Sequence, residues 1–313
     1  IIILGFAGVI LLGTLLLMLP ISTTARNVTP FNEALFTSTS AVCVTGLVVQ
    51  DTGSYWSVFG QVIILGLIQI GGLGVVTVAA SFALLSGRKI SLMQRSTMQD
   101  AISAPKVGGI VRLTRFILRG TFLIELLGAL AMLPVFCRDY GLRGVWMAVF
   151  HSISAFCNAG FDIMGKYKPY SSFTAYYDDP VVSFTLCALI LIGGIGFIVW
   201  SDIIDHKWHF KKYALQTKMV LSFSAVLVFG GALLFYLLER NNLYADMSTT
   251  GIICSSFFSV ITPRTAGFNT LDIGAFTEGG KLLTIILMFI GGGSGSTAGG
   301  VKMATIFVLL LHL

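Results

Sequence analysis

The chain has 313 residues, of which 55% are hydrophobic and only 11% are charged. Soluble domains carry about 25% charged residues, and no soluble core could hide this much apolar surface. The composition therefore predicts an all-α polytopic membrane protein, with no nucleic-acid partner. The five cysteines are dispersed and the four histidines lack a paired spacing, so neither a disulfide nor a zinc site is expected.

The first part of the chain, residues 1–87, predicts two spanning helices around a shorter one. Apolar runs at 1–19 and within 57–85 are long enough to cross a hydrocarbon layer of roughly 30 Å. The run at 1–19 lacks the basic flank and the cleavage site of a signal peptide. Between the two runs, 30–42 is too short and too polar to cross, which predicts a re-entrant half-helix.

The same order of elements is predicted twice more, in 88–205 and in 206–313. The second repeat has apolar runs at 116–136 and 181–200 around the short segment 143–156. The third has an apolar run at 219–238, the short segment 248–262, and a last span in two pieces at 282–290 and 303–313.

A motif that contains a glycine follows each half-helix, at 43–47, 157–161 and 264–268. When Gly46, Gly160 and Gly267 are aligned, every copy has a phenylalanine ten residues upstream (Phe36, Phe150, Phe257) and a serine eight residues upstream (Ser38, Ser152, Ser259). Long internal repeats in a membrane protein usually indicate pseudosymmetric units around an axis. We interpret that axis as a pore.

The residues of these motifs suit a cation filter, although one copy alone would indicate only a turn. Non-helical backbone at membrane depth must line water or pack in protein. Glycine reaches positive φ values, which turn consecutive carbonyls toward an ion, and the negative end of each half-helix dipole favours a cation. We expect the side chains of Leu47, Phe161 and Phe268 to pack outward. The expected ion-binding backbone comprises Cys43, Val44, Thr45, Gly46, Cys157, Asn158, Ala159, Gly160, Arg264, Thr265, Ala266 and Gly267.

A glycine-rich segment at 291–302 interrupts the last helix of the third repeat, where helix propensity is lowest. A small-residue seam for close helix packing is the alternative, but so many glycines break a helix. Lys302 and Glu125 are charges within apolar surroundings, and Glu125 is expected to have a partner. The predicted loop comprises Gly291, Gly292, Gly293, Ser294, Gly295, Ser296, Thr297, Ala298, Gly299, Gly300 and Lys302.

The two connections between repeats, 87–119 and 202–218, carry eleven basic residues against three acidic ones. The opposite side carries eight basic residues against ten acidic ones. The excess of lysine and arginine predicts that the connections are cytoplasmic and that the filter mouth is extracellular. Binding of anionic lipid by the basic connections is an alternative use of the same charge, and it agrees with this orientation.

Six motifs in combination carry a family resemblance: VCVTGL (42–47), GLIQIGGLG (66–74), HSISAFCNAGFD (151–162), LIGGIGF (191–197), VITPRTAGFN (260–269) and GGGSGSTAGGVK (291–302). Over its whole length the chain resembles the membrane subunit of the Trk/Ktr/HKT superfamily of potassium transporters, and it is most similar to the Ktr type. The resemblance implies four helix, pore-helix, helix units around one pore, with pseudo-fourfold symmetry.

The resemblance also implies potassium uptake across the plasma membrane, with K⁺ bound only at the filter residues and no covalent cofactor. Plant members with serine at the first filter glycine are associated with sodium transport, and this position is Gly46 here. The loop at 291–302 would be a gate below the filter. The implied partners are a second copy of the chain and a cytosolic ring of nucleotide-binding regulatory subunits. We expect the ring to dock on the basic face that includes Arg88, Lys89, Lys211 and Lys212.

A fourth filter is expected about one repeat length beyond Gly267, which lies past Leu313. Thr297-Ala298-Gly299 follows Gly267 too closely to supply it. We interpret the sequence as three repeats of a longer four-repeat protein, with a three-repeat protein as the second choice.

Two alternative functions are compatible with parts of the sequence. One is a sodium-coupled or sodium-permeable cation transporter of the same superfamily, which leaves a sodium dependence open. The other is an intramembrane enzyme, which would need convergent catalytic groups. Glu125 alone does not supply them, so the chain is not expected to be an enzyme.

Overall fold

The computed structural model describes residues 2–74, 77, 78, 96, 99, 109–166, 168–207 and 209–312. Within these residues the regular elements are helices, accompanied by two isolated bridges. Short helical turns lie in the loops, at Pro20–Ser22, Thr52–Tyr55 (α3), Met164–Lys166, Thr174–Tyr176, Phe210–Lys212 and Ile273–Ala275.

The first repeat contains α1 (Ile2–Leu17), α2 (Phe31–Val42) and α4 (Val58–Leu73). The half-helix expected at 30–42 corresponds to α2. The run at 57–85 is not one helix, because α4 ends where Gly74 adopts a φ of 82°. Of the residues from 75 to 85, only Thr77 and Val78 are among those described, and both are helical.

The second repeat contains α7 (Ile110–Tyr140), α8 (Arg143–Phe156), α9 (Pro180–Ile195) and α10 (Phe197–His206). The half-helix expected at 143–156 is α8. The run at 181–200 is not one straight helix, because the chain bends by 93° between α9 and α10. Gly196 lies at the bend with a φ of 102°, a conformation that suits glycine and interrupts the helix.

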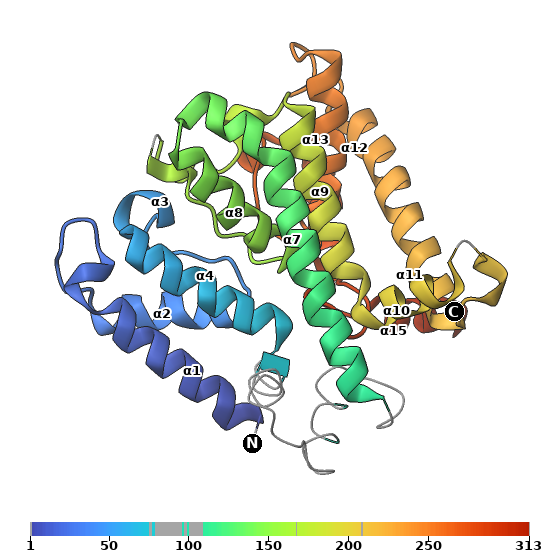
Figure 1. The fold of residues 1–313 in the computed structure, drawn as a ribbon. Coiled ribbons are helices and arrows are strands. Elements are labelled where there is room, and N and C mark those ends of the chain that lie inside the picture. Colours follow the sequence, from blue (N-terminus) through green and yellow to red (C-terminus); the bar gives the residue numbers. More distant parts are fainter. Residues whose placement is uncertain are drawn as a thin grey trace.

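The third repeat begins with α11 (Leu215–Ala225) and α12 (Gly231–Glu239), which a π-helical segment at Val226–Gly230 joins into one long helix. The half-helix expected at 248–262 is α13 (Thr249–Ile261). The last span is in two pieces, α14 (Glu278–Phe289) and α15 (Met303–His312). Figure 1 shows the first repeat in blue beside α7 and α8 in green, with α11 and α12 beyond α9.

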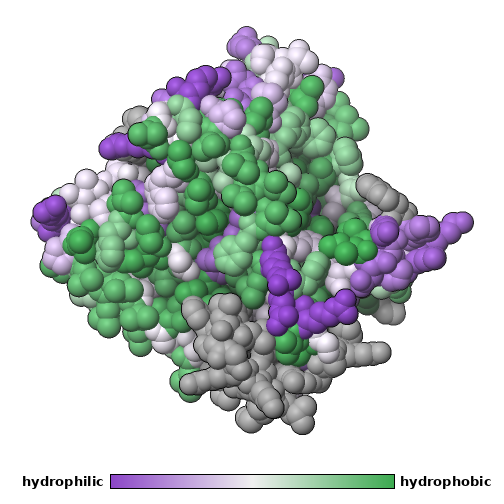
Figure 2. Space-filling view, in the orientation of Figure 1, coloured by the Kyte–Doolittle hydropathy of each residue, from purple (hydrophilic) through white to green (hydrophobic). Residues whose placement is uncertain are grey.

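Length and composition make two of the described helices able to cross a membrane, Ile110–Tyr140 and Leu215–Glu239. The bent pair α9 and α10 would be a third, and α1, α4 and α13 are shorter apolar helices. Hydrophobic side chains cover the middle of the face seen in Figure 2, and hydrophilic ones gather at its upper rim and lower right. This distribution is typical of a protein surrounded by lipid.

Each half-helix is held by helices on both sides. The first helix of a repeat packs on its own half-helix, as α1 does on α2, α7 on α8, and α12 on α13. In the first two repeats the helix after the glycine motif packs back on the half-helix and also reaches the next repeat, since α4 contacts α8 and α9 contacts α13. The half-helices therefore converge on the interior of the molecule.

The repeated serine upstream of the filter glycine has a structural role in the first two repeats. Ser38 Oγ donates to the Ile10 carbonyl at 2.7 Å, and Ser152 Oγ donates to the Glu125 carbonyl at 2.6 Å. Each bond ties a half-helix to the first helix of its own repeat. Each bond also gives a buried serine hydroxyl an acceptor, and such a donor would be costly to leave unpaired at membrane depth.

Glycine allows the second helix to pass directly under the end of the half-helix. A Cβ atom placed on Gly71 of α4 would lie 2.1 Å from the Val42 carbonyl oxygen. A Cβ atom on Gly193 of α9 would lie 2.0 Å from the Phe156 carbonyl oxygen. Real Cβ contacts are never this short, so any side chain at these two positions forces the backbones apart.

We predict that Gly71→Ala lowers the stability of the folded protein by about 1–3 kcal/mol, the usual cost of overpacking a well-packed interior. The matched control is Gly66→Ala in the same helix, where a Cβ atom meets nothing within 4 Å. That change should be neutral or stabilising by up to about 1 kcal/mol, because alanine favours helix. Thermal unfolding of the two variants in detergent measures the difference. Equal transition temperatures would contradict the close approach.

Candidate functional site

The three glycine motifs lie directly after the half-helices and share one backbone conformation. Val44, Asn158 and Thr265 have φ values of 54°, 55° and 69°. Two residues later, Gly46, Gly160 and Gly267 have φ values of 79°, 71° and 90°. The residue between each pair has a negative φ. This alternation of positive and negative φ differs from a β-strand, in which φ stays negative and successive carbonyls alternate between the two sides.

The three motifs also meet one another. A Cβ atom placed on Gly46 would lie 2.5 Å from the carbonyl oxygen of Ala159. One placed on Gly160 would lie 2.3 Å from the carbonyl oxygen of Ala266, and one on Gly267 would lie 3.7 Å from the Gly160 Cα atom. Gly46 and Gly160 are therefore required both for their φ values and for the approach of the neighbouring segment, whereas Gly267 is required for its φ value.

Hydrogen bonds from the half-helices hold the motifs in place. The amide of Thr45 donates to the Ser40 carbonyl at 2.8 Å, and the amide of Ala159 donates to the Ser154 carbonyl at 2.8 Å. The third motif differs, since the amides of its alanine and its glycine both donate to the Thr262 carbonyl, at 3.0 and 3.1 Å. Pro263, which lacks an amide proton, follows Thr262 and shifts this pattern by one residue.

The outward packing expected for Leu47, Phe161 and Phe268 occurs in only two of the three motifs. The side chains of Phe161 and Phe268 are fully buried, and the ring of Phe268 lies 5.4 Å from that of Phe173. Leu47 is 60% exposed, so this part of the expectation is wrong. Among the described residues, the loop that carries Phe173 covers the third motif, whereas the first motif has an open flank.

Hydrogen bonds also hold the segments that follow the first two glycine motifs. His151 of α8 is buried, and its Nε2 accepts a hydrogen bond from the Ile163 amide at 3.1 Å. Asp51, after the first motif, accepts from the Tyr170 amide at 3.0 Å, which joins the first repeat to the second. Asp162 lies two residues after Gly160, and burial raises the pKa of its carboxyl group to about 6.

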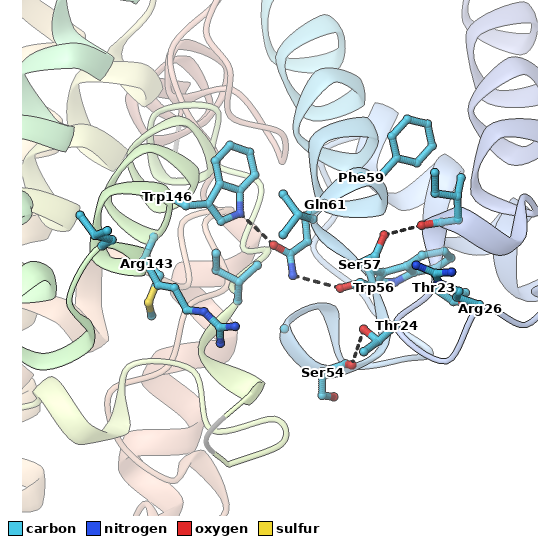
Figure 3. A pocket seen from close by; sticks show the side chains of 16 residues that line it. Thr23, Thr24, Arg26, Ser54, Trp56, Ser57, Phe59, Gln61, Arg143 and Trp146 are labelled. Carbon is cyan, nitrogen blue, oxygen red and sulfur yellow. Dashed lines mark hydrogen bonds between the residues drawn. The ribbon is translucent and has the colours of Figure 1, made fainter.

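Gln61 joins the first two repeats beside a cavity of about 920 Å³ (Figure 3). Its side-chain oxygen accepts from Trp146 Nε1 at 2.8 Å, and its nitrogen donates to the Trp56 carbonyl at 3.1 Å. Arg26 and Arg143 approach this cavity from opposite sides in the same view. The contact fixes α8, and with it the second motif, against the first repeat.

The glycine-rich segment forms a non-helical loop between α14 and α15, as its composition predicted. A bridge between Ile290 and Val301 closes the loop at its base. Lys302 Nζ turns back and donates to the Ala298 carbonyl at 2.7 Å. All of the predicted loop residues therefore lie in one compact segment.

The loop is attached to the second repeat, a contact that no sequence motif indicates. Thr297 Oγ1 donates to the carbonyl of Phe156, the last residue of α8, at 3.0 Å. The amide of Gly293 donates to the Gly194 carbonyl at 2.8 Å, and the amide of Phe197 donates to the Gly295 carbonyl at 2.8 Å. These contacts place the loop against the end of the half-helix that precedes the second motif.

Arg264 is expected in the filter, and its side chain contacts the glycine-rich region. Its guanidinium is buried, and Nη2 lies 3.7 Å from Met303 Sδ at the start of α15. Asn158 links the second and third motifs, since its side-chain amide lies 3.4 Å from the Thr265 hydroxyl. Both side chains thus bind the motifs to each other and to α15.

The partner of Glu125 is Gln69 of α4. Gln69 Nε2 donates to both carboxylate oxygens of Glu125, at 3.0 and 3.3 Å, and Cys157 Sγ lies 3.8 Å from Gln69 Oε1. This buried group connects α7, α4 and the first residue of the second motif. Gln69 was missed in the sequence, where its only signal was a single amide within the apolar run GLIQIGGLG.

Comparisons with known proteins place these features in a family. Residues 6–313 match the TrkH family, described as a cation transport protein. The chain belongs to this family. It is 40% identical over 311 residues to the potassium/sodium uptake protein NtpJ of Enterococcus hirae, covering 99% of this chain and 68% of that protein. It is 41% identical over 309 residues to the Ktr system potassium uptake protein B of Bacillus subtilis, covering 98% of this chain and 68% of that protein.

The fold is similar to the crystal structure of the potassium transporter TrkH from Vibrio parahaemolyticus, with a TM-score of 0.69 and 20% identity. The match covers 98% of this chain and 60% of that one. The resemblance to the Trk/Ktr superfamily is therefore confirmed, as is the expectation of an all-helical, multi-pass membrane protein. The family is one of transporters, which confirms that the chain is not an enzyme. It spans about two thirds of the relatives it matches.

We predict that Glu125→Leu lowers the stability of this family member by about 1–3 kcal/mol, because it leaves the partly buried Gln69 amide without an acceptor. Glu125→Gln keeps a carbonyl acceptor and should cost less. The control is Glu33→Leu, which removes a Glu33–Gln50 bond of 3.0 Å from a less buried site. Thermal unfolding in detergent measures the stability of the three variants relative to the unmodified protein. A loss for Glu33→Leu as large as that for Glu125→Leu would refute the buried pair.

Proposed function

We propose that this chain takes up potassium through a filter of backbone carbonyls, three sides of which are 43–47, 157–161 and 264–268. The observation that carries the proposal is the shared alternation of φ in these motifs, with Gly46 and Gly160 in close approach to the next motif. Carbonyls turned to one side can replace the hydration shell of a cation. The half-helices add the negative ends of their dipoles.

Potassium is the proposed ion, bound at these filter residues only. The resemblance favours it, as does glycine rather than serine at position 46, and the relative from Bacillus subtilis is named a potassium uptake protein. The relative from Enterococcus hirae is named a potassium/sodium uptake protein. Sodium-coupled or sodium-permeable transport is therefore the second candidate.

We infer that each repeat is one unit of the pore, with boundaries at 1–87, 88–205 and 206–313, and that a fourth unit closes the ring. The exposed flank of the first repeat supports this inference. Leu47 is 60% exposed where Phe161 is buried, Cys43 is exposed where Cys157 is buried, and Phe36 is 42% exposed where Phe150 is buried. A fourth filter beside the first would cover this apolar flank.

The glycine-rich loop is proposed as the gate. Its contacts to Phe156 and Gly194 put it at the inner end of α8, below the second motif. A loop without helical hydrogen bonds can move with less disruption than a helix. Movement of this loop would open the path below the filter and leave the filter carbonyls in place.

The orientation and partners also follow from the charge pattern and the resemblance. The filter mouth would be extracellular and the basic connections cytoplasmic, in the plasma membrane. A second copy and a ring of nucleotide-binding regulatory subunits are the proposed partners. Of the proposed docking residues, Lys211 and Lys212 lie on an exposed turn between α10 and α11. Arg88 and Lys89 lie outside the described residues.

Substitution of the filter glycines tests the proposal. Alanine at Gly160 or Gly46 should lower the preference for potassium over sodium by about tenfold or more. A loss of about 1.4 kcal/mol in the binding free energy of potassium relative to sodium lowers the ratio of their affinities tenfold. Alanine at Gly267 should have a smaller effect, because its Cβ atom has more room. Uptake of both ions is measured in cells that lack potassium uptake systems and express the full-length protein.

Gly141→Ala is the control for backbone strain, because Gly141 has a φ of 61° and a Cβ atom there meets nothing within 4 Å. It should leave the ion preference unchanged. An unchanged preference in all three filter variants would remove the filter assignment.

The gate makes a separate prediction. Thr297→Val loses the bond to the Phe156 carbonyl and should change the rate of potassium flux, whereas Thr297→Ser keeps the hydroxyl and should behave like the unmodified protein. Deletion of 292–299 should raise or abolish flux. None of these changes should alter the potassium to sodium ratio. A change in that ratio as large as the change in flux would place the loop in the filter.

A further inference from the structure

A groove of about 850 Å³ lies between α7 and the bent pair α9 and α10, at the end of α7 far from the filter mouth. One wall is the first part of α7, where Arg112, Arg115 and Arg119 are exposed. They are spaced by three and four residues, so they lie on one face of the helix. The other wall is apolar and includes Trp200 and Ile204.

The three arginines carry charge that the described residues do not balance. Within the described part of the chain, none of the ion pairs includes them. The described residues that line the groove include no carboxylate. Three guanidinium groups directed at one space favour an anionic occupant, and arginine binds phosphate oxygens through two parallel hydrogen bonds.

The rest of the groove is suited to hydrocarbon. The indole of Trp200 satisfies its Nε1 by donating to the Ile192 carbonyl at 2.9 Å, which leaves its ring as an apolar wall. Leu123 and Ile204 line the groove and are 57% and 59% exposed. Further along α7, Leu126 and Leu130 are 56% and 52% exposed, which is the lipid-facing surface of a spanning helix. The groove therefore opens from a cationic end onto that surface.

We propose that this groove binds an anionic phospholipid, with the phosphate group at Arg112, Arg115 and Arg119 and the acyl chains along Trp200, Leu123 and Ile204. A basic pocket between spanning helices is a recognised way for a membrane protein to hold an anionic headgroup. A soluble acidic partner would match the arginines but would leave the apolar wall without a partner. The lipid satisfies both ends of the groove.

Quenching of tryptophan fluorescence by brominated lipid tests the site directly. The full-length protein is reconstituted in phosphatidylcholine vesicles, in which a fixed share of the lipid is replaced by brominated phosphatidylglycerol or by brominated phosphatidylcholine. The anionic lipid should quench more than the zwitterionic one. This excess should disappear in Trp200→Phe, because Trp200 forms the wall of the groove.

Arginine variants distinguish the groove from general attraction to a charged membrane. In Arg112→Gln/Arg115→Gln/Arg119→Gln the relative affinity for phosphatidylglycerol should fall on the order of tenfold or more, given the attraction of each basic residue to anionic lipid. The three Arg→Lys changes keep the charge and should retain most of the excess. A charge-matched control, Arg138→Gln/Arg143→Gln/Arg240→Gln, removes three arginines at the opposite end and should retain all of it.

Three results would each overturn the proposal: equal quenching by the two lipids in the unmodified protein, an excess that survives in the triple glutamine variant, or an equal loss in the charge-matched control. Gel filtration and thermal unfolding verify that each variant is folded. If the triple glutamine variant does not fold, the comparison of the lysine variant and Trp200→Phe with the unmodified protein still decides the outcome.

Discussion

The need to satisfy backbone polar groups at membrane depth determines how this molecule is built. Three half-helices end inside it, and each exposes carbonyls that lipid cannot pair. The carbonyl of Phe156 accepts from Thr297, and the carbonyls of Phe161 and Phe268 accept from Ser154 and Thr262 at 2.6 Å. The other carbonyls of the three glycine motifs would bind a dehydrated cation in the proposed filter, so the same constraint that shapes the fold would also provide the site.

Much of this arrangement was predictable because its signals are local. A half-helix differs from a spanning helix by length and polarity over a dozen residues, and Gly46, Gly160 and Gly267 are needed for their own φ values. The partner of Glu125 was not predictable, since Gln69 lies on a helix of another repeat. The bend at Gly196 was also missed, because 181–200 is apolar on both sides of it. The exposure of Leu47 was not predictable either, because it depends on a segment that is distant in the sequence.

The three repeats share a plan but differ where their neighbours differ. Ser38 and Ser152 make equivalent hydrogen bonds because α1 and α7 pack on their half-helices in the same way. The third repeat carries a π-helical segment in its first helix and a loop in its second. Pro263 shifts the hydrogen bonds of its filter by one residue. The pseudosymmetry is therefore strictest at the glycine motifs, where three segments must present equivalent carbonyls, and weakest around the proposed gate.

The glycine-rich loop is held to the second repeat by few enough hydrogen bonds that it could exchange between an attached and a released position. Four hydrogen bonds join it to the second repeat: those from Thr297 to Phe156 and Gly193, and those that link Gly293 and Gly295 to α9 and α10. Each contributes about 0.5–1.5 kcal/mol, so release of the loop costs a few kcal/mol. Coupling free energies between sites are typically 1–3 kcal/mol. The cost of releasing the loop is therefore of the same order as a typical coupling free energy, and a partner that acts on α10, whose first amide binds the loop, would be placed to shift the proposed gate.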